Sequence, residues 1–313
     1  MEEYELINRI LKNVEKVILG KEEEILHLIK GIIAGGHILI EDVPGVGKTT
    51  LVKAICKSLN LTFSRIQFTP DLLPSDITGV SIYNQKSGEF EFKKGPVFSN
   101  IVLADEINRS SPKTQSALLE VMEENQVSEG LNTFILGRPF IVMATQNPVE
   151  YEGTFNLPEA QLDRFMLKVK IGYADKATEA QILQKYKFSE PLNELEAVAN
   201  KEDIIGLQEK VKLIRVSDPI AEYIVSITSM TRNNKYIALG ASTRASLSLL
   251  RIAQASAMIN RREYVTPDDV KNCASSVLSH RVKMSSAGRA NGLTSEDIIK
   301  DIIERTDVPR AVE

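Results

Sequence analysis

Short apolar segments alternate with helical patterns through the first half of the chain. Five of these segments are apolar at both even and odd positions and are predicted to be strands: residues 37–40, 63–68, 101–104, 140–144 and 167–171. Strands that are apolar on both faces are typical of a parallel sheet covered by helices. Apolar residues at helical spacing from Leu6 to Ile33 also predict helices on either side of Val17 to Gly20. The pattern therefore predicts an α/β domain built on a parallel-sheet core.

The strand pattern stops near Ala174, and several helix starts follow it. Thr266 to Asp269 and Thr294 to Asp297 have the pattern of a capping box. Asp218-Pro219 predicts a helix capped by Asp218, with these apolar residues on one face: Ile220, Tyr223, Ile224 and Ile227. We therefore expect residues 1–174 to form the α/β core and residues 175–313 to form an all-helical domain.

Two connections inside the α/β part have the pattern of β-hairpins. Apolar residues alternate from Ile82 to Phe92 around Ser87-Gly88, and two short runs flank Gly130 between Asn125 and Phe134. A plain parallel sheet does not need hairpins in these connections, so we expect them to be insertions with a function. The first is predicted to be an exposed element that contacts a partner, because binding residues concentrate on exposed loops. A purely structural role is the alternative.

Composition and charge place the chain among soluble globular proteins. Of its 313 residues 43% are hydrophobic and 26% charged, and the net charge is −4 with a pI of about 5.7. This balance provides no basic field for nucleic acid. The N-terminus lacks a secretory signal pattern and no apolar run could cross a bilayer, so we expect a cytoplasmic protein without membrane insertion. The three histidines, His27, His37 and His280, follow no metal-site spacing, and we expect structural or surface roles for them. We expect Cys56 and Cys273 to be small buried residues.

The segment after the first predicted strand has the composition of a phosphate-binding loop. A turn of Pro44, Gly45, Val46 and Gly47 precedes Lys48, Thr49 and Thr50, which open the helix-forming run 51–58. Glycines allow successive backbone N–H groups to point at one anion, and the helix N-terminus favours negative charge. Lys48 is predicted to reach the β- and γ-phosphates, and the Thr49 hydroxyl to bind Mg²⁺. Asp42 stands where the usual pattern has its first glycine.

Polar residues end or precede three of the other predicted strands. Asp105 and Glu106 follow strand 101–104, and we expect Asp105 to bind Mg²⁺ and Glu106 to polarise an attacking water. Asn147 comes after strand 140–144. We expect the end of this strand to lie between the end of strand 37–40 and the end of strand 101–104, where Asn147 could hold the attacking water. Arg164 precedes the last strand. Each has an ordinary alternative: surface acids, an Asn that caps a turn before Pro148, and an arginine in a surface ion pair.

In this order the motifs resemble those of AAA+ ATPases, and specifically the MoxR family. Residues 44–49 resemble its Walker A motif, 103–109 its Walker B motif, 144–148 its sensor 1, and 157–165 its arginine-finger segment. Residues 240–245 resemble sensor 2, with Thr243 where proline is more usual. The two hairpins match the helix-2 insert and the pre-sensor-1 hairpin of this clade. The resemblance covers nearly the whole chain and implies a P-loop NTPase core followed by an all-α lid domain.

The resemblance also implies the cofactors, the assembly and the roles of the site residues. It implies ATP and Mg²⁺, a homo-oligomeric ring that is commonly a hexamer, and ATP at the subunit interfaces. Arg164 is expected to act on the nucleotide of the neighbouring subunit, and Arg244 to touch the γ-phosphate from the lid. The segment that includes Val17, Ile18 and Gly20 resembles the family segment near adenine.

Members of this family are described as chaperone-like ATPases that assemble or activate other proteins, often with a von Willebrand factor A domain partner. Three other functions compete with this one. A nucleic-acid motor is disfavoured by the acidic balance and by the lack of a basic stripe. A P-loop small-molecule kinase does not need Glu106, Asn147 and a lid bearing Arg244. A ring that binds ATP only as a scaffold would not need the water-activating Glu106.

Overall fold

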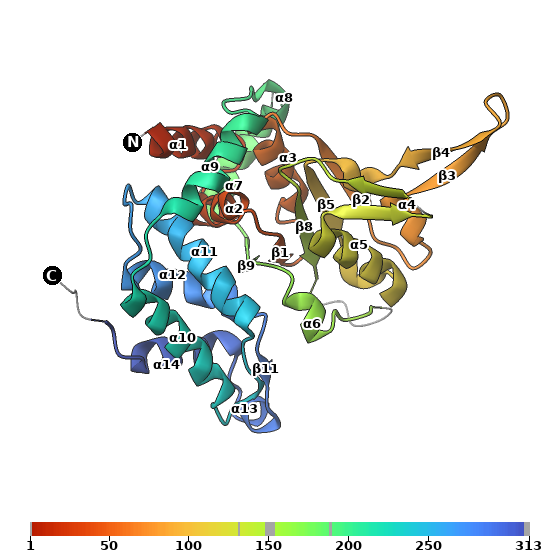
Figure 1. Cartoon of the computed structure of the whole chain (residues 1–313). Coiled ribbons are helices and arrows are strands. Elements are labelled where there is room, and N and C mark those ends of the chain that lie inside the picture. The colour runs from red at the N-terminus through yellow and green to blue at the C-terminus, as the bar shows by residue number, and fades with distance from the viewer. Residues whose placement is uncertain (1, 131, 148–153, 188–189, 310–313) are drawn as a thin grey trace.

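A five-stranded parallel sheet forms the centre of the computed structural model (Figure 1), which describes residues 2–130, 132–147, 154–187 and 190–309. The strand order is β2-β5-β8-β1-β9, and every neighbouring pair is parallel. The strands are β1 (Ile38–Glu41), β2 (Phe63–Gln67), β5 (Ile101–Asp105), β8 (Ile141–Gln146) and β9 (Leu167–Val169). All five predicted strands are confirmed, and β8 lies between β5 and β1 as expected.

Strands β1, β5 and β8 carry apolar residues at both even and odd positions, because both faces of the sheet are covered there. Alternate residues of β5, for example, enter two different apolar clusters: Ile101 and Leu103 one, Val102 and Ala104 the other. The first cluster includes α1 (Glu2–Glu15), α2 (Glu22–Ala34) and α3 (Lys48–Ser58). The second includes α5 (Pro112–Glu124). The predicted layered α/β core and the two N-terminal helices are therefore confirmed.

Both predicted hairpins are present. The first pairs β3 (Gly79–Asn84) with β4 (Glu89–Lys94) after the short helix α4 (Pro74–Thr78), and it projects far from the body of the molecule (Figure 1). The second pairs β6 (Gln126–Glu129) with β7 (Asn132–Ile135); Leu131 in its turn lies outside the described residues. The rings of Phe92 and Phe134 stack with centroids 4.2 Å apart and join the two hairpins.

The part of the chain after the sheet that the structure describes is mainly helical, as expected. A short antiparallel pair, β10 (Ile237–Leu239) and β11 (Lys283–Met284), was not predicted, because segments of two or three residues carry no readable periodicity. The helices are α7 (Lys176–Tyr186), α8 (Pro191–Glu194), α9 (Lys201–Leu213), α10 (Asp218–Arg232), α11 (Thr243–Ile259), α12 (Pro267–Leu278), α13 (Ser286–Ala290) and α14 (Ser295–Arg305). Three short helices complete the core: η1 (Pro96–Phe98), η2 (Ile107–Arg109) and α6 (Glu159–Leu162).

Two of the three predicted helix starts agree with the structure, and the third is displaced by one residue. Thr266 and Thr294 each form a capping box, since their backbone N–H groups donate to Asp269 and Asp297 at 2.9 Å. The prediction that Asp218 caps α10 was wrong by one residue, because Ser217 occupies the N-cap position and Asp218 begins the helix. The predicted apolar face of α10 is fully buried: Ile220, Tyr223, Ile224 and Ile227.

Both cysteines are buried, and burial raises the pKa of Cys56 and of Cys273. This agrees with their expected role as small core residues. His37 is fully buried between β8 and α5: its Nδ1 accepts from the Val142 amide, so its Nε2 must donate to Met122 O, both at 3.0 Å. No helix within the described residues is long and apolar enough to span a membrane.

Candidate nucleotide-binding site

The loop between β1 and α3 has the backbone of an anion-binding turn. Gly45 and Gly47 have φ of 86° and 85°, a left-handed conformation that side chains other than glycine rarely adopt. Gly47 is also the N-cap of α3, so the loop leads directly into the positive end of the helix dipole. Lys48 Nζ donates to the carbonyls of Asp42 at 2.8 Å and Val43 at 3.2 Å and so lies against the loop.

Asp42, the residue that departs from the usual motif, has a clear structural role. Its Oδ2 accepts hydrogen bonds from the backbone amides of Ile171 and Gly172, both at 2.6 Å, and its Oδ1 accepts from the Val43 amide at 2.8 Å. The carboxylate therefore ties the start of the loop to the chain that leaves β9. A glycine at this position could not make these bonds.

Asp105 and Glu106 lie at the carboxyl end of β5, where one hydroxyl from β8 contacts both residues. Thr145 Oγ1 donates to Asp105 Oδ1 at 2.6 Å and accepts from the Glu106 backbone amide at 2.8 Å. Glu106 has φ of 57°, and the bond from its amide supports this unusual conformation. Thr145 is 1% exposed, so water does not replace these bonds. The two predicted acids are therefore held in a fixed relation to each other.

Strand β2 contributes two residues that were not predicted to belong to the site. Arg65 donates to Asp105 Oδ2 from Nε at 2.9 Å and from an Nη at 2.6 Å. Gln67 Nε2 and Arg109 Nη1 each donate to Glu106 Oε2 at 2.9 Å. Polar residues at alternate positions of the edge strand β2 were the available signal.

Asn147 follows β8 directly and is 5% exposed. Because β8 lies between β1 and β5, Asn147 stands at the carboxyl edge of the sheet between the P-loop strand and the strand that carries the two acids. Pro148, the other half of the predicted motif, lies outside the described residues.

A cavity of about 400 Å³ opens beside the P-loop. Val17 and Ile18, two of the three residues expected near adenine, line it together with P-loop residues 45–47 and Thr50. Gly20 does not line the cavity and instead approaches Thr178 closely. The opposite wall was missed by the sequence reasoning and comes from the segment around α7: Tyr173, Ile182, Leu183 and Tyr186. Aromatic and aliphatic walls next to a phosphate-binding loop suit a flat base such as adenine.

Arg164 is far from the P-loop of its own chain. It precedes β9, and the Met166 amide donates to His37 O at the amino end of β1, whereas the P-loop follows the carboxyl end. A four-residue strand separates these edges by about 10 Å. Arg164 Nη1 donates to Leu119 O at 2.9 Å and to Glu123 Oε2 at 2.8 Å, both on α5.

Arg244, which is expected to touch a γ-phosphate from the lid, lies near Arg164 and not at the P-loop of its own chain. Its Nη2 donates to Glu123 Oε1 at 2.5 Å, so Glu123 bridges Arg164 of the core and Arg244 of the lid. The physical reason is the docking of the lid, which places the start of α11 beside the end of α6: Ser242, the N-cap of α11, donates to Asp163, the residue that follows α6. The sequence order of the motifs does not contain this information.

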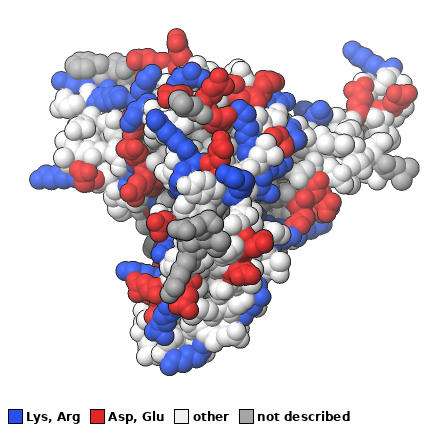
Figure 2. All heavy atoms as spheres, turned by 60° about the vertical axis from the view of Figure 1, so that its left-hand side comes forward, with Lys and Arg blue, Asp and Glu red and all other residues white. Residues whose placement is uncertain are grey.

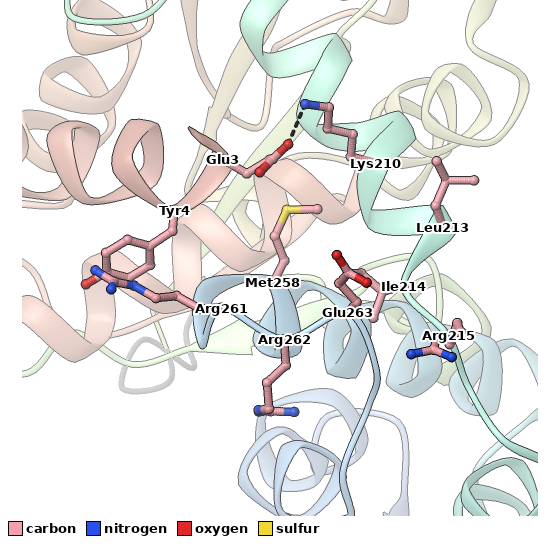
Figure 3. Close-up of a pocket in the computed structure, with 10 residues that line it drawn as sticks. All are labelled: Glu3, Tyr4, Lys210, Leu213, Ile214, Arg215, Met258, Arg261, Arg262 and Glu263. Atoms are coloured by element: carbon pink, nitrogen blue, oxygen red, sulfur yellow. Dashed lines mark hydrogen bonds and ion pairs between the residues drawn. The ribbon is translucent and has the colours of Figure 1, made fainter. Parts of the chain in front are cut away.

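A larger cavity, of about 630 Å³, lies between α1, α9 and the end of α11, away from the P-loop (Figure 3). Most of the charged side chains around this cavity already interact with other residues of the chain. Lys210 pairs with Glu3, Arg262 forms a bidentate pair with Asp269, and Arg261 stacks on the Tyr4 ring at 3.7 Å. It contains none of the residues predicted for the site, so we assign it no part in nucleotide binding.

The residues at the P-loop fit a nucleotide with Mg²⁺. Open space lies beside Gly45 and Gly47, where an added Cβ atom would meet no atom within 4 Å and a phosphate can approach the backbone. Among the described residues no cluster of three or more His, Cys, Asp or Glu could hold a metal alone. Mg²⁺ typically takes one or two protein ligands and completes its shell with phosphate and water, and Thr49 and Asp105 are the residues available for this.

The sequence matches two family models, and their positions agree with this architecture. The first, "ATPase family associated with various cellular activities (AAA)", matches residues 37–167, and the second, "AAA lid domain", matches residues 229–302. Chaperone MoxR1 of Mycobacterium tuberculosis is 38% identical over 98% of this chain and 84% of its own. The chain belongs to the MoxR family of AAA+ ATPases.

Two further proteins resemble this MoxR-family chain over nearly its full length. Bacillus subtilis protein YeaC is 49% identical over 97% of this chain and 95% of its own. A crystal structure from Cytophaga hutchinsonii has a TM-score of 0.91 and 42% identity, and covers 99% of this chain and 96% of that one. The P-loop NTPase core and the helical lid are therefore the MoxR-family fold.

Proposed function

We propose that this MoxR-family protein hydrolyses ATP to ADP and phosphate at a site that two subunits complete. The observation that carries the proposal is the convergence of three strand ends: the P-loop after β1, Asn147 after β8, and Asp105 and Glu106 after β5 lie at one edge of the sheet. Phosphoryl transfer depends mainly on positioning and charge neutralisation, and this edge supplies both.

Each residue at this edge has a distinct role in the proposal. Lys48 leaves the carbonyls of Asp42 and Val43 and neutralises phosphate charge. Glu106, released from Gln67 and Arg109, accepts a proton from the attacking water, and Asn147 orients that water. Thr49 and Asp105 would hold Mg²⁺, which would offset negative charge on the phosphate oxygens.

Arg164 and Arg244 act on the nucleotide of the adjacent subunit. Neither reaches the P-loop of its own chain, because both are paired with Glu123 near the amino edge of the sheet. In a ring of identical subunits this edge faces the nucleotide of the next copy. The guanidinium groups of Arg164 and Arg244 can then leave Glu123 and bind phosphate oxygens of that nucleotide. An arginine supplied in this way is worth about 10³ to 10⁵ in turnover in related reactions.

The hairpins are the proposed contact with a client protein. Several of their apolar side chains are exposed, among them Phe90 at 73% and Ile135 at 81%, and the Phe92–Phe134 stack joins the hairpins into one surface. Exposed aromatic residues are enriched at protein interfaces. The face shown in Figure 2 intersperses Lys and Arg with Asp and Glu, so it offers no uniform basic surface for nucleic acid.

The client surface is tested with Tyr83→Ser combined with Phe90→Ser, because both side chains are exposed and their loss leaves the Phe92–Phe134 stack intact. Co-purification from the native cell should lose a partner, for example a von Willebrand factor A domain protein, while ATP hydrolysis remains. Leu213→Ser is the matched control, since Leu213 is 78% exposed on α9. Identical partners for all three proteins would remove the hairpins from the proposal.

Hydrolysis itself is tested by phosphate release from Mg-ATP at increasing protein concentration, with Glu106→Gln as the inactive control. We expect the activity per subunit to rise with concentration until the ring is complete, because assembly follows mass action. Phosphate release no faster than that of Glu106→Gln at every concentration would show that the protein is not an ATPase.

A further inference from the structure

Arg281 is a buried cation that forms hydrogen bonds to the main chain on both sides of Arg164. It follows α12 in the lid and is 4% exposed. Its Nη2 donates to Asp163 O at 3.2 Å and to Phe165 O at 2.8 Å, and its Nη1 donates to Met166 O at 3.3 Å. The carbonyls that flank Arg164 in the core therefore share one donor from the lid.

The same guanidinium is anchored firmly in the lid. Nη1 also donates to Val277 O and Nη2 to Ser248 Oγ, both at 3.0 Å. Its Nε lies 3.1 Å from Asp163 Oδ1, an ion-pair contact. The other oxygen of Asp163 accepts from Ser242 Oγ at 2.8 Å, and Ser242 is the N-cap of α11.

A neutral histidine next to Arg281 strengthens this junction. His280 Nε2 is 2.9 Å from Phe165 O, so it donates to the same carbonyl as Arg281. Burial, with the charge of Arg281 adding to it, holds the pKa of His280 well below its usual value. Burial also lowers the pKa of Arg281, to about 10, so it remains a cation at neutral pH.

Burying a cation between the core and the lid carries an unfavourable desolvation free energy. This desolvation costs several kcal/mol unless hydrogen bonds and an opposite charge offset it, and well-packed apolar residues of similar volume often give the same stability. The hydrogen bonds of Arg281 instead hold the carbonyls of the residues before and after Arg164. The arrangement is suited to setting the position of Arg164.

We propose that Arg281 is a positioning residue: it holds the main chain around Arg164 against the lid, so that the lid of one subunit sets the approach of Arg164 to the nucleotide of the next. The proposal rests on the proposed function of Arg164. Arg281 forms hydrogen bonds both to the lid and to residues 163–166 of the core. A change in the angle of the lid in one subunit would therefore move Arg164 relative to the nucleotide of the adjacent subunit.

Arg281→Lys tests this, because lysine keeps the charge but cannot reach several carbonyls at once. We expect kcat to fall on the order of 10²-fold, the effect of a misplacement of about 1 Å, with nucleotide affinity unchanged. Asp163→Asn, a milder variant of the same junction, should show the same split. Arg262→Lys is the matched control, because it breaks a bidentate ion pair inside the lid that does not touch residues 163–166.

Subunit mixing separates a positioning role from damage to the variant's own site. Lys48→Ala subunits retain a correctly held Arg164, so adding them to Arg281→Lys subunits should restore hydrolysis at the intact P-loops of the variant. Arg262→Lys should keep nearly normal kcat and gain nothing from mixing. A normal kcat for Arg281→Lys, or a low kcat that Lys48→Ala subunits do not raise, would overturn the proposal.

Amide hydrogen exchange gives a readout that does not depend on catalysis. In Arg281→Lys the amides of residues 159–166 should exchange faster, while those of the P-loop, residues 42–50, should not change. Unchanged exchange at residues 159–166 would refute the positioning role even if kcat fell. An unmutated protein without ATPase activity would refute the proposed function instead, and the exchange experiment would still decide the role of Arg281.

Discussion

Thr145 offers the sharpest test of how Asp105 and Glu106, the acids of the proposed site, are held. Its hydroxyl is the only part of the side chain that Thr145→Val removes, since valine has nearly the same shape. Two bonds are lost: the 2.6 Å bond to the Asp105 carboxylate and the 2.8 Å bond from the Glu106 amide. The Glu106 amide is then left without its acceptor in a backbone conformation that non-glycine residues rarely adopt.

The magnitude follows from the two bonds. A hydrogen bond to a charged group contributes about 1.5–3 kcal/mol and an ordinary one about 1 kcal/mol, so the free energy of unfolding should fall by about 2.5–4 kcal/mol. Turnover should fall further than stability alone explains, by about 10- to 100-fold, because Glu106 loses its fixed position relative to the attacking water. Nucleotide affinity should not change, since the P-loop and Lys48 are untouched.

The assay compares kcat, nucleotide Kd and urea unfolding for Thr145→Val and a matched control, Thr228→Val. Thr228 is also fully buried and its hydroxyl also forms several hydrogen bonds, to Ile224 O and Val225 O and from Ser246 Oγ, but it lies in the lid. Both variants should lose stability, and only Thr145→Val should lose turnover. Equal kcat values for the two variants would refute the role assigned to Thr145.

Three further outcomes are expected. Lys48→Ala should abolish ATP binding in a fluorescence titration, because the loop amides alone do not neutralise the phosphate charge; unchanged affinity would exclude this loop as the site. Glu106→Gln should bind ATP normally and lose turnover by several orders of magnitude, and normal turnover would identify another base. Burial lowers the pKa of His37 to about 4. As the pH falls from 6.5 to 4, the free energy of unfolding should therefore fall by up to about 1.4 kcal/mol per pH unit, because the unfolded state takes up the proton first. His37→Gln should flatten this slope in urea unfolding, and an unchanged slope would contradict the assignment.

Much of the core could be predicted because its signals are local. The strands that precede the P-loop and the Walker B acids carry apolar residues at both even and odd positions, which is typical of a sheet covered on both faces. The hairpin β3–β4 has a turn signal at Ser87-Gly88 and alternation on both sides. The β10–β11 pair was missed because its strands have three and two residues and their partners are far apart in sequence.

The site was predictable only where one segment carries the chemistry. The P-loop and the Asp105-Glu106 pair are continuous motifs, and both lie at the expected edge of the sheet. Arg65 and Glu123 were missed because their partners come from elsewhere in the chain: Arg65 is 40 residues from Asp105, and Glu123 is 121 residues from Arg244. Lid docking sets these distances in space, and no local pattern encodes it.

The measurement that tests the central claim most directly mixes two inactive subunits. Arg164→Ala keeps its P-loop and Lys48→Ala keeps its arginine, so each interface that joins them in the right order has a complete site. In an equal mixture of freely exchanging subunits about a quarter of the interfaces are complete, and we expect about a quarter of the unmutated activity. No activity in exchanging mixtures, together with an activity per subunit that does not depend on protein concentration, would contradict a site shared between subunits.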